Sequence, residues 1–117
     1  MGDFSNLGGK TMFKHPETIV ALSQMEHSRD QLLVNAEMDY LREENRIKME
    51  FLESSISAKM ILCENDKEKD KLLQEYDQEM KKLVREYEKK SVQVVKRYEE
   101  KEKALIERTE REIKNIV

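Results

Sequence analysis

The sequence predicts an all-α chain built around one long helix, and three observations lead to this fold class. Of its 117 residues, 40% are charged and only 38% are apolar, a balance typical of coiled coils rather than of globular domains. All three glycines and the only proline lie within residues 1–16. Further along, apolar side chains recur every eleven residues, a spacing that indicates repeated helical structure.

Residues 1–16 are expected to form an extended N-terminal arm. This segment has the sequence MGDFSNLGGKTMFKHP and contains every glycine of the chain. It also carries large apolar side chains that so short and glycine-rich a segment cannot bury on itself. We expect these side chains to anchor the arm in a groove on another protein. They are Phe4, Leu7, Met12 and Phe13.

The helix is predicted to start at the end of this arm. Pro16 suits the first helical position, where its missing N–H costs nothing, and the acidic Glu17 favours the positive end of the helix dipole. The remaining chain divides into a two-faced amphipathic segment, residues 17–63, and a segment of eleven-residue repeats, residues 64–117. No glycine or proline interrupts either segment.

The repeat predicts the interface of a coiled coil. Eleven residues over three turns give about 3.67 residues per turn, which favours a right-handed or nearly straight supercoil. The apolar columns fall within about 100° of the helix circumference, the width of a normal packing face. The predicted interface consists of Tyr40, Phe51, Leu62, Leu72, Leu73, Tyr76, Met80, Leu83, Val84, Tyr87, Val94, Val95, Tyr98, Leu105, Ile106, Ile113 and Ile116.

A second apolar face is predicted between residues 36 and 63, roughly opposite the first. A helix with two apolar faces needs two neighbours, and methionine adapts to irregular surfaces. We therefore expect this face to meet a second protein partner. Its residues are Met38, Leu41, Met49, Leu52, Met60 and Cys63.

A helical hairpin that turns near residues 63–66 is the alternative fold. The column stays in phase from Leu62 to Leu73 across this point, and the segment has no glycine. Both observations favour a single continuous helix. Asn65 and Glu102 are polar residues at column positions, where such residues commonly fix the register of helix pairing.

The residue patterns predict no catalytic, cofactor or metal site. Gly9-Lys10-Thr11 lacks the leading glycine of a phosphate-binding loop, and His15, His27 and Cys63 lack partners at ligand or catalytic spacing. The net charge of −3 with interleaved signs argues against nucleic-acid binding. No apolar stretch approaches the roughly 18 residues of a transmembrane helix, and no secretory signal or small-molecule substrate site is expected.

These patterns predict a non-catalytic structural rod or scaffold subunit that bridges or braces partners in a larger cytoskeletal, axonemal or stalk-like assembly. Its expected partners are other helices, in homo- or hetero-oligomers, and its expected location is intracellular, in the cytoplasm or on the cytoskeleton. The alternative is a regulatory coiled-coil adaptor whose N-terminal arm binds and modulates an enzyme or motor.

Overall fold

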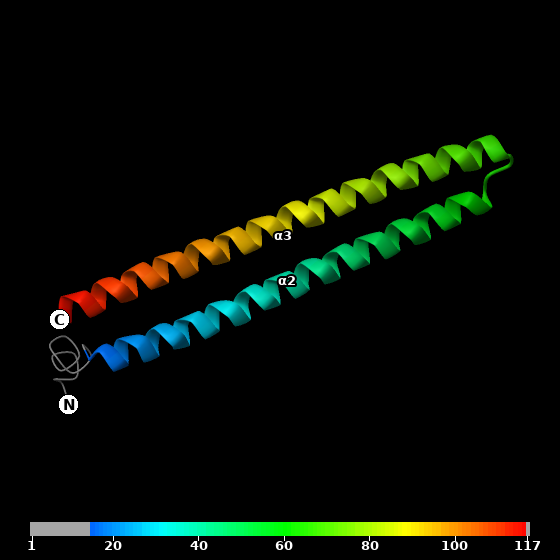
Figure 1. Cartoon of the computed structure of the whole chain (residues 1–117). Coiled ribbons are helices and arrows are strands. Elements are labelled where there is room, and N and C mark those ends of the chain that lie inside the picture. Colours follow the sequence, from blue (N-terminus) through cyan, green and yellow to red (C-terminus); the bar gives the residue numbers. More distant parts are fainter. Residues whose placement is uncertain (1–14, 117) are drawn as a thin grey trace, which may run out of the picture. The chain divides into compact units, whose positions relative to one another are not determined.

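The computed structural model of the chain describes residues 15–116 and contains two long α-helices (Figure 1). Helix α2 spans Pro16–Ile61 and helix α3 spans Asp66–Ile116. No strand occurs within these described residues. The all-α prediction is therefore confirmed, whereas the single continuous helix is wrong, and the two helices fit the hairpin alternative.

Helix α2 begins where the sequence predicts. Its first residue is Pro16, and the amide of Ile19 donates to the carbonyl of His15 at 3.0 Å, which closes the first turn. Glu17 lies in this turn, beside the positive end of the helix dipole. The start of α2 thus follows from local chemistry alone.

The connection between the helices uses a polar cap in place of glycine. Helix α2 ends with tighter turns, in which the amides of Leu62 and Cys63 reach carbonyls three residues earlier. The side chain of Asn65 then accepts a hydrogen bond from the amide of Glu68 at 2.9 Å, and the Glu68 carboxylate accepts one from the amide of Glu64 at 3.0 Å. This reciprocal arrangement resembles a capping box and starts α3.

The lack of glycine is therefore no obstacle to a turn here. No non-glycine residue with positive φ occurs in the described part of the chain, so the connection needs no left-handed residue. The eleven-residue interval from Leu62 to Leu73 also does not exclude a turn, because it is a property of the sequence that two separate helices leave unchanged. Both arguments for a continuous helix thus apply equally to this connection.

The chain divides into two compact units. The turn unit is Ala36–Val94, and the terminal unit combines α2 up to Asn35 with α3 from Val95. In the turn unit, Glu44 pairs with Lys90 and Lys48 pairs with Glu86, so the two helical segments are antiparallel.

The two helical segments of the terminal unit are antiparallel as well. There Ser23 meets Thr109, Glu26 meets Arg108 and His27 meets Glu102. As the residue numbers of the contacts rise along α2, the numbers of their partners on α3 fall. Each unit is therefore an antiparallel pair of helical segments.

The shielded positions of α3 recur at eleven-residue spacing. Apart from Lys90, every buried or half-buried residue of α3 belongs to one of three sets with this spacing. The sets are Leu72, Leu83, Val94, Leu105 and Ile116; Tyr76, Tyr87, Tyr98 and Thr109; and Met80, Ser91, Glu102 and Ile113. Val94 in the turn unit and Leu105 in the terminal unit are each only 4% exposed.

Candidate protein-interaction surface

The turn unit packs apolar side chains from both helices against each other. Leu41, Leu83 and Tyr87 line a small hollow between α2 and α3, and Leu41 is only 8% exposed. Glu44, Lys48, Glu86 and Lys90 complete the wall of the hollow. The contact between α2 and α3 at this hollow therefore has an apolar centre and a charged margin.

These four charged residues form a closed ring of ion pairs. Lys48 Nζ lies 2.9 Å from Glu44 and 3.1 Å from Glu86, while Lys90 Nζ lies 3.2 Å from Glu44 and 3.0 Å from Glu86. Hydrogen bonds from the two ammonium groups hold the pKa values of both carboxyls below the ordinary value. The same bonds raise the pKa values of both lysines. The ring fixes the register of the two segments.

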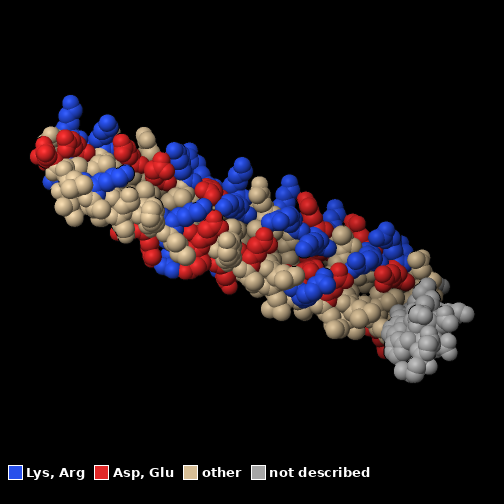
Figure 2. Space-filling view, turned by 180° about the vertical axis from the view of Figure 1, so that it is seen from behind, with Lys and Arg blue, Asp and Glu red and all other residues tan. Residues whose placement is uncertain are grey.

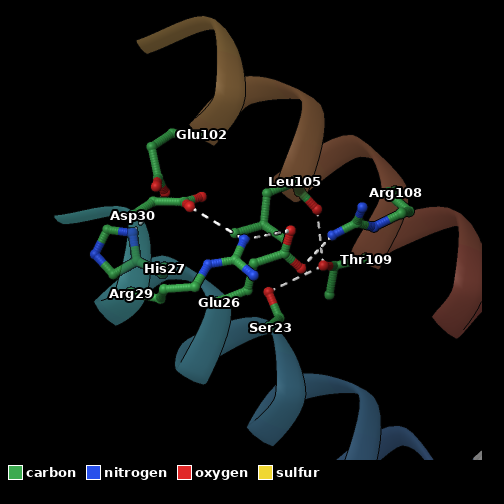
Figure 3. A network of polar contacts seen from close by, with 9 residues as sticks. All are labelled: Ser23, Glu26, His27, Arg29, Asp30, Glu102, Leu105, Arg108 and Thr109. Carbon is green, nitrogen blue, oxygen red and sulfur yellow. Dashed lines mark hydrogen bonds and ion pairs between the residues drawn. The ribbon is translucent and has the colours of Figure 1, made fainter. Parts of the chain in front are cut away.

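The terminal unit contains a second polar cluster between its helices (Figure 3). His27 Nδ1 contacts the Glu102 carboxylate, and Arg108 pairs with Glu26. This contact with Arg108 lowers the pKa of the Glu26 carboxyl. Thr109 places its hydroxyl 3.0 Å from that of Ser23. These contacts hold the two segments in one register.

Buried carboxylates accompany this cluster. Asp30 is only 6% exposed and lies 3.2 Å from an Arg29 nitrogen. One oxygen of Glu102 is buried without a hydrogen-bond partner, which costs free energy because its lost hydration is not replaced. Burial, with the nearby charges of Glu102 and Asp30, raises the pKa of the Tyr98 hydroxyl. The cluster therefore resembles a register-fixing polar layer.

The predicted coiled-coil interface divides into two groups in the structure. One group is buried or half-buried between the helices. It consists of Leu72, Tyr76, Met80, Leu83, Tyr87, Val94, Tyr98, Leu105, Ile113 and Ile116. The other group is exposed to solvent. It consists of Tyr40, Phe51, Leu62, Leu73, Val84, Val95 and Ile106.

The predicted second face lies on the shielded side of α2. Its six residues Met38, Leu41, Met49, Leu52, Met60 and Cys63 are all buried or half-buried. Leu41 lies against α3 in the turn unit, and Leu52 and Cys63 follow it at eleven-residue spacing. Leu41 thus packs against α3 of the same chain, and a separate protein partner for the face stays a prediction.

A flank of α2 beside this shielded side carries exposed apolar side chains in the turn unit. There a mostly apolar row, here called the outer row, recurs with steps of four, four and three residues; its polar members Glu44 and Ser55 are half-buried, and Glu44 also pairs with Lys90 of α3. The row consists of Ala36, Tyr40, Glu44, Ile47, Phe51, Ser55, Ala58 and Leu62. Tyr40 is 68% exposed, Phe51 76% and Leu62 80%. Large apolar side chains lined up in water in this way mark an interaction surface.

Sequence reasoning missed Ile47, Ala36 and Ala58 as members of this row. The signal was present, because these three residues follow each other at eleven-residue intervals beside Tyr40 and Phe51. The same spacing continues into the terminal unit, where Leu22, Met25 and Leu33 are exposed on α2. Helix α2 thus carries two apolar faces, one used within the chain and one exposed.

Charged side chains of both signs lie beside uncharged surface on one face of the molecule (Figure 2). Figure 2 shows acidic and basic side chains interleaved over the face that it presents, with uncharged surface between them. Among residues 15–116, no group of histidine, cysteine and carboxylate side chains could hold a metal ion. Neither described helix has an apolar stretch long enough to cross a membrane.

The predicted arm anchors Phe4, Leu7, Met12 and Phe13 lie outside the described residues. Comparisons with protein-family models, with curated proteins and with solved structures find no match to this chain.

Proposed function

We propose that the chain is a non-catalytic structural subunit that joins a larger assembly through the outer row of α2. The exposure of Tyr40, Phe51 and Leu62 supports this function most directly. Leaving three large apolar side chains in water on one helix face is unfavourable, and covering them with another helix removes that cost. We therefore propose that the chain functions with another helix bound over this surface.

The geometry of the row suggests what kind of surface covers it. Its steps of four, four and three residues give the eleven-residue period of a nearly straight or right-handed coiled coil. A helix with the same period would stay in contact along the whole row. We therefore propose that the outer row enters a helical bundle or coiled coil.

The surroundings of the row support a scaffold more than an enzyme. The polar clusters at Glu44 and at Glu102 consist of charges that contact one another across the two helices. Catalysis needs a concave, water-excluding site with groups free to act on a substrate. We propose a bridging or bracing role in the cytoplasm or on the cytoskeleton, as the sequence suggests.

A site-specific photocrosslinker tests this function in the full chain. The probe replaces Phe51 in the outer row, and a control chain carries it at Val92, which is similarly exposed on α3. We expect the probe at position 51 to form covalent adducts with helical segments. The probe at position 92 should form far fewer adducts. Equal adduct formation at both positions, or none at position 51, would contradict the proposal.

A further inference from the structure

We propose that a second copy of this chain covers the outer row, with the two α2 helices antiparallel and the centre of symmetry between Ile47 and Phe51. This inference rests on the proposed function, because it names the partner of the same surface. All residues that carry it belong to the turn unit. The argument depends on size, charge and area.

The row is self-complementary in size when it is read in opposite directions. About the proposed centre, Ile47 faces Phe51 of the other copy, and Tyr40 faces Ala58. Ala36 then faces Leu62 at the ends of the row. Each large side chain thus meets a small or medium one, which lets the two helices interdigitate at normal packing distance.

A parallel pair would lack this match. There Phe51 would face Phe51 and Tyr40 would face Tyr40, while the alanine positions would leave gaps between the helices.

The charges beside the row favour the same orientation. One margin of the row carries Glu37, Lys48 and Lys59 at eleven-residue spacing. In the antiparallel pair Glu37 lies beside Lys59 of the other copy, and this contact occurs twice. The two Lys48 side chains approach each other near the centre, where each is already neutralised by Glu44 and Glu86.

The available area suits a reversible dimer. A buried aromatic side chain covers about 150–250 Å², and Tyr40 and Phe51 are roughly three-quarters exposed in the single chain. Four such rings could therefore bury roughly 400–700 Å² between two copies. With Ile47 and Leu62 the total approaches the roughly 1,000 Å² of a specific interface. We expect dissociation in the micromolar range.

Mixed disulfide formation tests the orientation. In a Cys63→Ser background, one full-length chain carries Tyr40→Cys and another carries Ala58→Cys. We expect a disulfide between the two variants when they are mixed and little product from either alone. Identical positions then lie about 27 Å apart along the antiparallel helices, far beyond the roughly 7 Å limit between Cα atoms of bonded cysteines. Self-linking of each variant would overturn the antiparallel arrangement.

Sedimentation equilibrium tests the dimer itself. We expect the unmodified chain to show a monomer–dimer equilibrium, and Phe51→Glu to raise the dissociation constant at least 100-fold. The matched control Val92→Glu alters an equally exposed apolar residue of α3 and should leave the equilibrium unchanged. Circular dichroism checks that both variants keep their helix content.

The outcomes separate this inference from the proposed function. A monomer at all concentrations that still crosslinks to another protein through position 51 would overturn self-pairing and leave the proposed function standing. A monomer without adducts at position 51 would overturn both.

Discussion

Lys90 Nζ lies 3.2 Å from Glu44 Oε1, although 46 residues separate them in the chain. With the contact between Lys48 and Glu86 at 3.1 Å, it ties α2 to α3 at two successive helical turns of the turn unit. Each lysine also contacts the glutamate four residues away on its own helix. The pairing therefore specifies both direction and register.

Reversing one charge in this ring should destabilise the turn unit. Glu86→Lys would place three ammonium groups around Glu44, and their repulsion should lower the melting temperature. Reversing all four charges, with Glu44→Lys, Lys48→Glu, Glu86→Lys and Lys90→Glu, restores every pair and should recover most of the loss. Thermal unfolding by circular dichroism measures both effects. The deficit of the single variant should shrink in 1 M salt, where surface charges are screened; a salt-independent deficit would contradict this explanation.

Adjacent residues on α3 should respond very differently to truncation. Leu105 is 4% exposed and Ile106 is 56% exposed. Leu105→Ala should lower the free energy of unfolding by about 2–5 kcal/mol, because it leaves a cavity between the helices. Ile106→Ala should cost less than about 1 kcal/mol. Urea unfolding of the two variants measures the difference, and similar losses would contradict the observed facing of α3.

The capping contact of Asn65 should be measurable in the same way. Asn65→Ala removes the acceptor for the Glu68 amide and should lower the free energy of unfolding by about 1 kcal/mol. Asn65→Asp keeps an acceptor and adds a charge favourable at a helix start, so it should be tolerated. Equal destabilisation by both substitutions would argue against a cap at this residue.

Acid should weaken the packing of both units. Hydrogen bonds from cationic partners lower the pKa values of Glu26, Glu44 and Glu86 below the ordinary value of 4.5. A carboxyl with a lowered folded-state pKa stabilises the fold above its unfolded-state pKa and loses this effect as pH falls through the folded value. The melting temperature should therefore be flat from pH 7 to about 5 and fall below about 4.5. Glu86→Gln should make the fall shallower, and an unchanged profile in that variant would exclude Glu86 as a contributor.

The sequence predicted helices, their eleven-residue period and the helix start, because these depend on local composition and spacing. It gave the turn near residues 63–66 only as the alternative, because the segment has no glycine and the cap by Asn65 was not recognised. In a continuous helix Asn65 occupies a column position, and only the hydrogen bond to Glu68 identifies it as a helix cap. The eleven-residue interval from Leu62 to Leu73 is the same in the sequence whether or not the chain turns between them.

The assignment of the faces depends on tertiary pairing, which periodicity does not encode. The columns through Leu105 and Ile106 differ by one residue, about 100° around the helix. Either could face a neighbour until the position of α2 is known. In the structure Leu41 packs against α3, and Tyr40 and Phe51 of the same helix are exposed.

A designed disulfide tests most directly that α2 and α3 of one chain pack on each other. The hydroxyls of Ser23 and Thr109 lie 3.0 Å apart in the terminal unit, whereas in a continuous helix these residues would be about 129 Å apart. In a Cys63→Ser background, Ser23→Cys with Thr109→Cys should close a disulfide within single chains, seen by intact mass and non-reducing electrophoresis at high dilution. Moving the first cysteine to the exposed Gln24 should prevent closure. Cysteines that stay reduced, or that link only separate chains, would contradict packing of the two helices within one chain.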